Sequence, residues 1–265
     1  MPIKQEIAVC PNSNIIEIYE TKNWTKIHTL TEHDLVVASI DWSSVNNKIV
    51  SCSHDRNAFV WSYIPATDQE PAMWKPALVL IHIDRAALYV KWALDGLRFG
   101  VASGDKCVAH CTYDAGGDWW VSKSIHRKIK SSVICLAFHP KNGQVLATGS
   151  TDFKCRIYST YSADVDGNGP EHVKSFPFTT PVPFGETYAE LSSNSWINCL
   201  AWSPSGNVLC YAGHDSTIHF ASNFGSIEPV VQTIKLSDLP LRSMLFVSEK
   251  AVVAGTYHVV DIKHV

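Results

Sequence analysis

The chain has few charged residues. Only 18% of its 265 residues are Asp, Glu, Lys or Arg, below the roughly 25% that is usual for globular proteins. In contrast, 46% are hydrophobic and nine are tryptophans. A chain with so many core-forming side chains can bury enough apolar surface to fold, which excludes disorder of the whole. Its length favours one or two domains, or a single all-β domain.

Long apolar runs are also missing. The longest purely apolar stretches, such as residues 77–81, have only a few residues, whereas a membrane-spanning helix needs about 20. The first residues, MPIKQEIAVCPN, include no apolar signal segment. We therefore expect a cytoplasmic protein that does not enter the membrane. A net charge of −3 provides no general attraction for nucleic acid.

Motifs for cofactors are absent as well. The sequence contains neither a phosphate-binding GxxxxGK[ST] motif nor a dinucleotide-binding GxGxxG motif. Cys107, His110 and Cys111 look like metal ligands, but the strand period places His110 on the face opposite both thiols. The eight cysteines are spread along the chain, and we interpret them as buried thiols rather than disulfides. We expect no cofactor and no metal.

Four segments of the chain repeat one pattern. They are residues 39–55, 89–105, 135–152 and 199–215. In each, an aromatic residue precedes an aspartate by 13, 13, 14 and 13 residues. The aromatic residues are Trp42, Trp92, Phe138 and Trp202, and the repeat-turn aspartates are Asp55, Asp105, Asp152 and Asp215. A constant spacing of this kind indicates an internal repeat.

Each repeat has the pattern of four short strands joined by turns, which is one blade of a β-propeller. The aspartates are 50, 47 and 63 residues apart, more than the usual repeat of about 40 to 45. We assign the excess to projecting loops at residues 62–73 and 161–194, where Pro and Gly disfavour strand and helix. The predicted organisation is one partial propeller over residues 1–265: a blade fragment at 7–30, blades at about 31–80, 81–126, 127–182 and 195–236, an insert at 161–194 and a partial blade at 237–265.

The first full repeat carries a polar tetrad. His33, Ser51, Asp55 and Trp61 are placed to form a buried chain of hydrogen bonds from indole to carboxylate. A Ser-His-Asp triad is the alternative, but Ser51 lacks the strand-to-helix turn of a nucleophile. We interpret the tetrad as structural. In the other repeats the tryptophan position is occupied by Cys111, Tyr158 and Ala221.

The sequence resembles the WD-repeat subunit family of the actin-related protein 2/3 complex. The resemblance covers most of residues 7 to about 220. It rests on the segments CPNSNIIEIYE, WTKIHTLTEHD, DRNAFVWS, WKPALVLIHIDRAALYVKWA, DWWVSKSIHRKIKSSV, TDFKCRIYSTY, PFGE and GHDST. It implies a seven-bladed propeller that catalyses no reaction and acts as a scaffold for actin nucleation and branching. The implied partners are the other subunits, the actin filament and the acidic tails of nucleation-promoting factors, in the cytoplasmic actin cytoskeleton.

The chain also departs from this family. The strands that close the family's propeller, and its projecting insert, have no counterpart here. We therefore expect an incomplete arc of about five to six blades, a truncated form with unpaired strand edges that favour aggregation. Two alternatives remain open: a generic WD-repeat adaptor for other proteins, and a non-functional truncated form. A hydrolase is a third hypothesis. It would need acids or a metal converging on the central channel, and the sequence shows no such set.

Several residues are candidates for partner binding. Lys123, Arg127, Lys128 and Lys130 form a basic cluster that would attract an acidic partner, or else lies on a solvated strand and turn. Trp119 and Trp120 are adjacent on a strand, so one should enter the core while the other is exposed or covered by a partner. Arg85 is a further candidate contact, and an ion pair between blades is its alternative.

Overall fold

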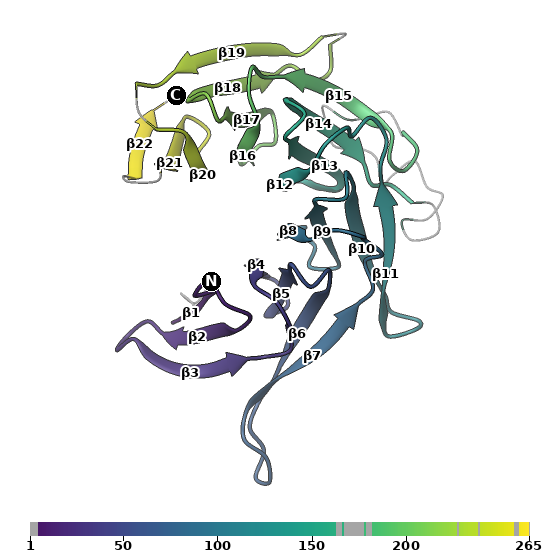
Figure 1. Cartoon of the computed structure of the whole chain (residues 1–265), viewed down its shortest axis with the longest axis vertical. Helices are drawn as coiled ribbons and strands as arrows, with labels where there is room; N and C mark the ends of the chain where they lie inside the picture. The colour runs from purple at the N-terminus through teal and green to yellow at the C-terminus, as the bar shows by residue number, and fades with distance from the viewer. Residues whose placement is uncertain are drawn as a thin grey trace.

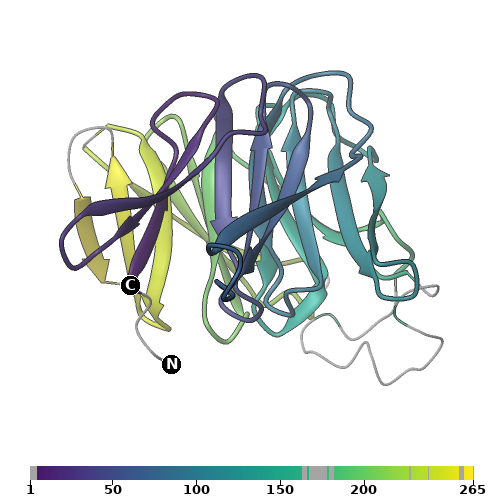
Figure 2. The same cartoon turned by 90° about the horizontal axis from the view of Figure 1, so that it is seen from below.

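The strands of the described residues lie in six antiparallel sheets, set side by side along an open arc (Figure 1). This computed structural model describes residues 5–162, 166, 178, 182–226, 228–237, 239–256 and 260–264. The strands run between the two faces of the arc (Figure 2). The described residues contain no helix long and apolar enough to cross a membrane. The predicted all-β, propeller-like class is confirmed.

The sheets are numbered here in chain order. Sheet 1 has β1 (Glu6–Val9), β2 (Ile16–Glu20) and β3 (Thr25–Leu30). Sheet 2 has β4 (Val37–Trp42), β5 (Lys48–Ser53), β6 (Ala58–Ile64) and β7 (Met73–Val79). Sheet 3 has β8 (Ala87–Trp92), β9 (Arg98–Ser103), β10 (Val108–Asp114) and β11 (Trp119–Ile125). Sheet 4 has β12 (Val133–His139), β13 (Asn142–Ser150), β14 (Lys154–Ser159) and β15 (Thr187–Ser192). Sheet 5 has β16 (Ile197–Trp202), β17 (Val208–Gly213), β18 (Thr217–Ser222) and β19 (Val230–Lys235). Sheet 6 has β20 (Leu241–Ser248), β21 (Ala251–Thr256) and β22 (Val260–His264).

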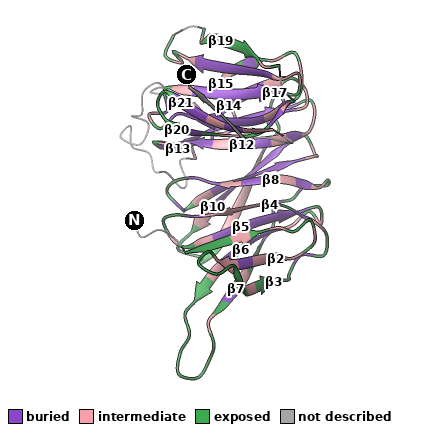
Figure 3. Cartoon of the chain, turned by 90° about the vertical axis from the view of Figure 1, so that its left-hand side faces the viewer, coloured by how far each residue is buried: buried purple, intermediate pink, exposed green. Residues whose placement is uncertain are grey.

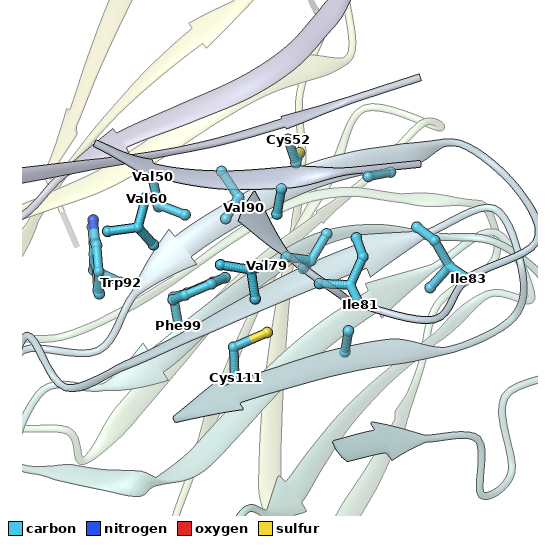
Figure 4. Packing of buried hydrophobic residues seen from close by; sticks show 14 of the residues in the cluster. Val50, Cys52, Val60, Val79, Ile81, Ile83, Val90, Trp92, Phe99 and Cys111 are labelled. Carbon is cyan, nitrogen blue, oxygen red and sulfur yellow. The ribbon is translucent and has the colours of Figure 1, made fainter. Parts of the chain in front are cut away.

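The core lies between the sheets. Each neighbouring pair of sheets encloses one cluster of buried apolar side chains. Figure 4 shows the cluster between sheets 2 and 3, where Val50, Val60 and Val79 meet Val90 and Phe99. Since burial of apolar surface is the main favourable term in folding, each sheet is stabilised chiefly by its neighbours.

The repeated aromatic residue connects neighbouring sheets. The indole nitrogen of Trp92 on β8 donates to the carbonyl of Asp41 on β4 at 3.1 Å. In the same way, Trp202 on β16 donates to the carbonyl of Ala137 on β12 at 3.2 Å. A buried indole N–H needs an acceptor, and the adjacent innermost strand supplies it. This accounts for the tryptophan in two of the four repeats, whereas Trp42 Nε1 donates to Asn47 Oδ1 of its own sheet at 3.0 Å and Phe138 has no side-chain N–H to donate.

The residue that follows each repeat aspartate has a positive φ. The angles are 71° at Arg56, 56° at Lys106, 68° at Phe153 and 62° at Ser216. These side chains disfavour the left-handed region, so the turn needs support. The aspartate side chain provides it in the way of an Asx turn, as Asp55 Oδ1 does by accepting the N–H of Asn57 at 2.8 Å.

The two predicted loops have different outcomes. The loop predicted at 62–73 is too long at both ends, because β6 continues to Ile64 and β7 begins at Met73. Residues 65–72 are all outside strands, and Figure 1 and Figure 3 show the exposed β6–β7 hairpin extending from the arc. The insert predicted at 161–194 is wrong at its end, because β15 occupies Thr187–Ser192 and pairs with β14. The Pro and Gly residues of the insert all precede Thr187. The segment TYAELS contains neither, so it can pair as the fourth strand of the sheet. Residues 163–165, 167–177 and 179–181 of the insert lie outside the described residues.

Candidate partner-binding surface

The tetrad forms a continuous buried chain of hydrogen bonds between sheets 1 and 2. Trp61 Nε1 donates to Ser51 Oγ at 2.9 Å, and Ser51 Oγ lies 2.8 Å from His33 Nε2. His33 Nδ1 lies 2.8 Å from Asp55 Oδ2. Because the indole only donates and the carboxylate accepts, the network assigns the Ser51 proton to His33 Nε2 and the ring proton to Nδ1. Ser51 is fully buried, so this hydroxyl meets no substrate.

The other repeat-turn aspartates fasten the connection that enters the innermost strand. Asp105 Oδ2 accepts the N–H of Asp84 at 3.0 Å, and Asp152 Oδ2 accepts the N–H of Lys130 at 3.0 Å. In sheet 5 the contact is made by a side chain, since Ser195 Oγ donates to Asp215 Oδ1 at 2.9 Å. In these repeats the aspartates hold the turn and the preceding connection in place, and this role requires no ligand.

The two adjacent tryptophans point to opposite faces of β11. Trp119 is 61% exposed, and its Nε1 donates to Asp114. Trp120 packs against the core cluster, with its ring 5.5 Å from Trp92 and 5.0 Å from Phe99. The alternation of a strand separates them. Trp119 is therefore the tryptophan of this pair that is available to a partner.

A groove of about 340 Å³ lies beside the tryptophans, between the outer strands of sheets 2 and 3. Both Trp119 and Trp120 line it, together with Tyr113, Lys48 and Lys75. The ammonium group of Lys48 lies 5.3 Å from the centre of the Tyr113 ring, a cation–π distance. Sequence reasoning missed both lysines. They lie on β5 and β7, and only the packing of neighbouring sheets brings them to β11.

The basic cluster is largely engaged with the chain itself. Lys123 Nζ donates to Ser162 Oγ at 2.7 Å, Arg127 pairs with Glu186 at 2.6 Å, and Lys128 Nζ donates to Thr187 Oγ1 at 3.0 Å. The backbone of Lys130 is held by Asp152, while its side chain is exposed. An acidic partner would therefore compete with Glu186 for Arg127. The contacts of Arg127 and Lys128 could not be foreseen, because they depend on the return of the chain to β15.

The candidate residues occupy opposite ends of sheet 3. Trp119 begins β11, whereas Arg127 follows its last residue, Ile125, and each strand residue advances about 3.3 Å. Arg85 is exposed and precedes β8 at the same end as Arg127, because Ala87 pairs with Ser103 and Val108 with Ile125. The tryptophans and the basic residues thus form two separate surfaces.

The three residues that look like metal ligands in the sequence are all buried. Cys107, His110 and Cys111 lie in or beside the core, and burial lowers the pKa of His110 to about 3, with the Arg98 charge as the second cause. Among the described residues, no group of three or more His, Cys, Asp or Glu side chains is arranged to hold a metal ion.

Comparison with known proteins gives two findings. The repeat family described as WD domain, G-beta repeat matches residues 24–62, 121–159 and 185–220. Each match starts at or near the outer strand of one sheet and continues through three strands of the next. The repeat in sequence is therefore shifted by one strand from the sheet in space.

Curated relatives cover nearly the whole chain. Actin-related protein 2/3 complex subunit 1A of Arabidopsis thaliana is 44% identical over 255 residues, which are 95% of this chain and 64% of the relative. Subunit 1A-B of Xenopus laevis is 40% identical over 94% of this chain and 65% of the relative. Subunit 1 of Schizosaccharomyces pombe is 37% identical over 96% and 66%.

The chain thus spans just under two thirds of the length of these relatives. The identity extends from sheet 1 to sheet 6, so it concerns the whole arc and not one repeat. By its repeats, its fold and its sequence identity, the chain is a WD-repeat homologue of the proteins named Actin-related protein 2/3 complex subunit 1.

Proposed function

We propose that the chain is a non-catalytic scaffold subunit of an actin-related protein 2/3 complex and supports actin filament nucleation and branching. The observation that carries this proposal is the 37–44% identity over 94–96% of the chain to proteins named as subunit 1 of that complex. Its partners would be the other subunits, the actin filament and the acidic tails of nucleation-promoting factors. Its place would be the cytoplasmic actin cytoskeleton.

The geometry is compatible with a scaffold in two respects. The tetrad, the set of residues most like a catalytic triad, is enclosed between two sheets, and Ser51 is fully buried. The exposed surface offers two distinct contact regions on sheet 3, the groove beside Trp119 and the basic cluster around Arg127. Aromatic and arginine side chains are enriched in protein interfaces, and cations steer acidic partners.

Co-purification tests the proposal directly. The tagged chain is co-expressed with the remaining subunits of the complex, and the eluate is analysed for the two actin-related proteins. We expect both in equal molar amount with the chain, and actin assembly that is faster than with the same mixture lacking the chain. Capture of neither actin-related protein would contradict the scaffold role and favour a WD-repeat adaptor for other partners.

A charge reversal tests the acidic-tail contact separately. In the assembled complex, Arg127→Glu places a second carboxylate beside Glu186 and should weaken binding of an acidic activator tail. Lys22→Glu, an exposed position on the connection between β2 and β3, is the matched control. Equal tail affinities of the two variants, measured by fluorescence anisotropy, would remove the basic cluster from the proposed interface while leaving subunit membership intact.

A further inference from the structure

The innermost strands of sheets 2 to 6 share an irregularity. Each of β4, β8, β12, β16 and β20, which face the centre of the arc in Figure 1, has a register break near its first residues. The residues skipped by the pairing are Ala38, Leu88, Ile134, Asn198 and Arg242. Such breaks are β-bulges, which redirect side chains and are frequent beside binding sites. The same bulge therefore recurs at the start of five innermost strands, which face the centre of the arc.

The bulges surround a pocket of about 230 Å³. All five skipped residues line it, and so do the residues that follow them on each strand, Ser39, Tyr89, Cys135, Cys199 and Ser243. One cavity is therefore built from five sheets, at the centre of the arc. It is smaller than the roughly 300–1,000 Å³ of a drug-sized site, which restricts an occupant to a small group or a single inserted side chain.

The described residues that line the pocket are rich in donors and include no acid. Arg242 is the only charged residue among them. Within the described part of the chain, the hydroxyl groups of Ser39, Tyr89 and Ser243 have no hydrogen-bond partner. Burial raises the pKa of Tyr89 well above its usual value, so its hydroxyl keeps its proton at neutral pH and can donate it. Burial likewise raises the pKa of Cys199 to about 12, although the charge of Arg242 opposes the rise.

We propose that this central pocket binds a small oxyanion, a phosphate or a carboxylate group, through the guanidinium of Arg242 and the three unbonded hydroxyls. A guanidinium matches the geometry of both groups, and its hydrogen bonds to them are charge-assisted. The neutral thiols of Cys135 and Cys199 add no negative charge that would repel the ligand. The assignment is independent of the proposed function, because none of these residues belongs to the surfaces on sheet 3.

Calorimetric titration of the whole chain tests the site. The probes are inorganic phosphate and N-acetylglutamate, each at an ionic strength held constant with sodium chloride. We expect saturable binding at one site per chain, and a loss of about tenfold or more in affinity for Arg242→Gln, since a hydrogen bond to a charged group is the strong kind. Lys250→Gln removes the same charge from the exposed turn after β20, outside the pocket, and should bind as the unmodified chain does.

The outcomes separate the two sources of the oxyanion. Saturable phosphate binding assigns the pocket to a free or covalently held phosphate, and binding of N-acetylglutamate alone assigns it to an acidic side chain. Absence of saturable binding for both probes overturns the proposal. Equal affinities of Arg242→Gln and Lys250→Gln also overturn it. If Arg242→Gln does not fold, Tyr89→Phe and Ser39→Ala remove one donor each, and unchanged affinity in both would decide against the site.

Discussion

Sheets 2 and 3 fill the same three buried positions with different chemistry. Counted from the repeat aspartate, His33, Ser51 and Trp61 of sheet 2 correspond to Ile83, Val101 and Cys111 of sheet 3. The first set forms the hydrogen-bonded tetrad against sheet 1. The second set is apolar and packs against sheet 2, where Figure 4 labels Ile83 and Cys111.

The comparison separates what the repeat requires from what it tolerates. Both sheets keep the aspartate turn, the aromatic residue on the innermost strand and complete burial of the three positions. Only sheet 2 keeps the polar chain. A fully satisfied polar network and an apolar core are both compatible with close packing, whereas a partly satisfied network is costly. The tetrad should therefore make sheet 2 the more sensitive of the two to single substitutions.

The largest difference is expected at the tryptophan position. Trp61→Ala should lower the free energy of unfolding by about 3–5 kcal/mol, because it opens a cavity beneath a fully buried indole. Cys111→Ala at the equivalent position of sheet 3 removes one sulfur atom and should cost roughly 1 kcal/mol. Urea unfolding of the two variants measures the difference, and similar costs would mean that sheet 1 packs too loosely on sheet 2 to support the tetrad.

The histidine position gives the next largest effect. His33→Leu removes the acceptor of the Ser51 hydroxyl proton and one donor to Asp55, and a buried hydroxyl left without its acceptor costs about 1–3 kcal/mol. Ile83→Leu in sheet 3 conserves volume and should cost less than about 1.5 kcal/mol. The same unfolding measurement applies. A smaller loss in His33→Leu than in Ile83→Leu would contradict the view that the network depends on every member.

Much of this contrast could be predicted from the sequence. The constant spacing from the aromatic residue to the aspartate determined the repeat, and the positions of His33, Ser51 and Trp61 relative to Asp55 determined the tetrad. These features are local, because each repeat folds by pairing strands that are adjacent in the chain. The alternation of β11 was enough to separate Trp119 from Trp120.

Features that depend on distant segments could not be predicted. Strand β15 was missed because the Pro- and Gly-rich residues before Thr187 obscured a short strand that pairs with β14. The contact of Arg127 with Glu186 depends on that same return of the chain. The groove between β7 and β11, and the central pocket with Arg242, exist only because neighbouring sheets are packed side by side.

A second histidine sharpens the comparison by its response to pH. His33 has partners on both ring nitrogens, whereas the buried Nε2 atom of His110 in sheet 3 has no hydrogen-bond partner among the described residues. Burial lowers the pKa of His110 from 6.5 to about 3. Between these values the unfolded chain binds a proton that the folded chain does not, so the free energy of unfolding falls as the pH falls.

The expected contribution of His110 is about 1.4 kcal/mol between pH 5.5 and pH 4.5. His110→Leu should reduce the pH dependence by this amount, since the apolar side chain does not titrate. His126→Leu, at an exposed position after β11, is the control and should leave the slope unchanged. Urea unfolding at both pH values provides the measurement. An unaltered slope in His110→Leu would show that the ring is accessible to protons in the folded chain.

The smallest difference concerns the aspartate turn that both sheets retain. Asp105→Asn keeps an oxygen that can accept the N–H of Asp84, so it should cost only about 0.5–1 kcal/mol. Asp55→Asn with its amide oxygen at the Oδ2 position keeps the bonds to Asp34 and His33, but the bond to His33 is no longer charge-assisted, and a charge-assisted bond is roughly twice as strong as a neutral one. Its cost should therefore be larger by about 1 kcal/mol. Equal costs in urea unfolding would mean that the carboxylate contributes to the turn alone, and that the two sheets differ only in how their buried side chains pack.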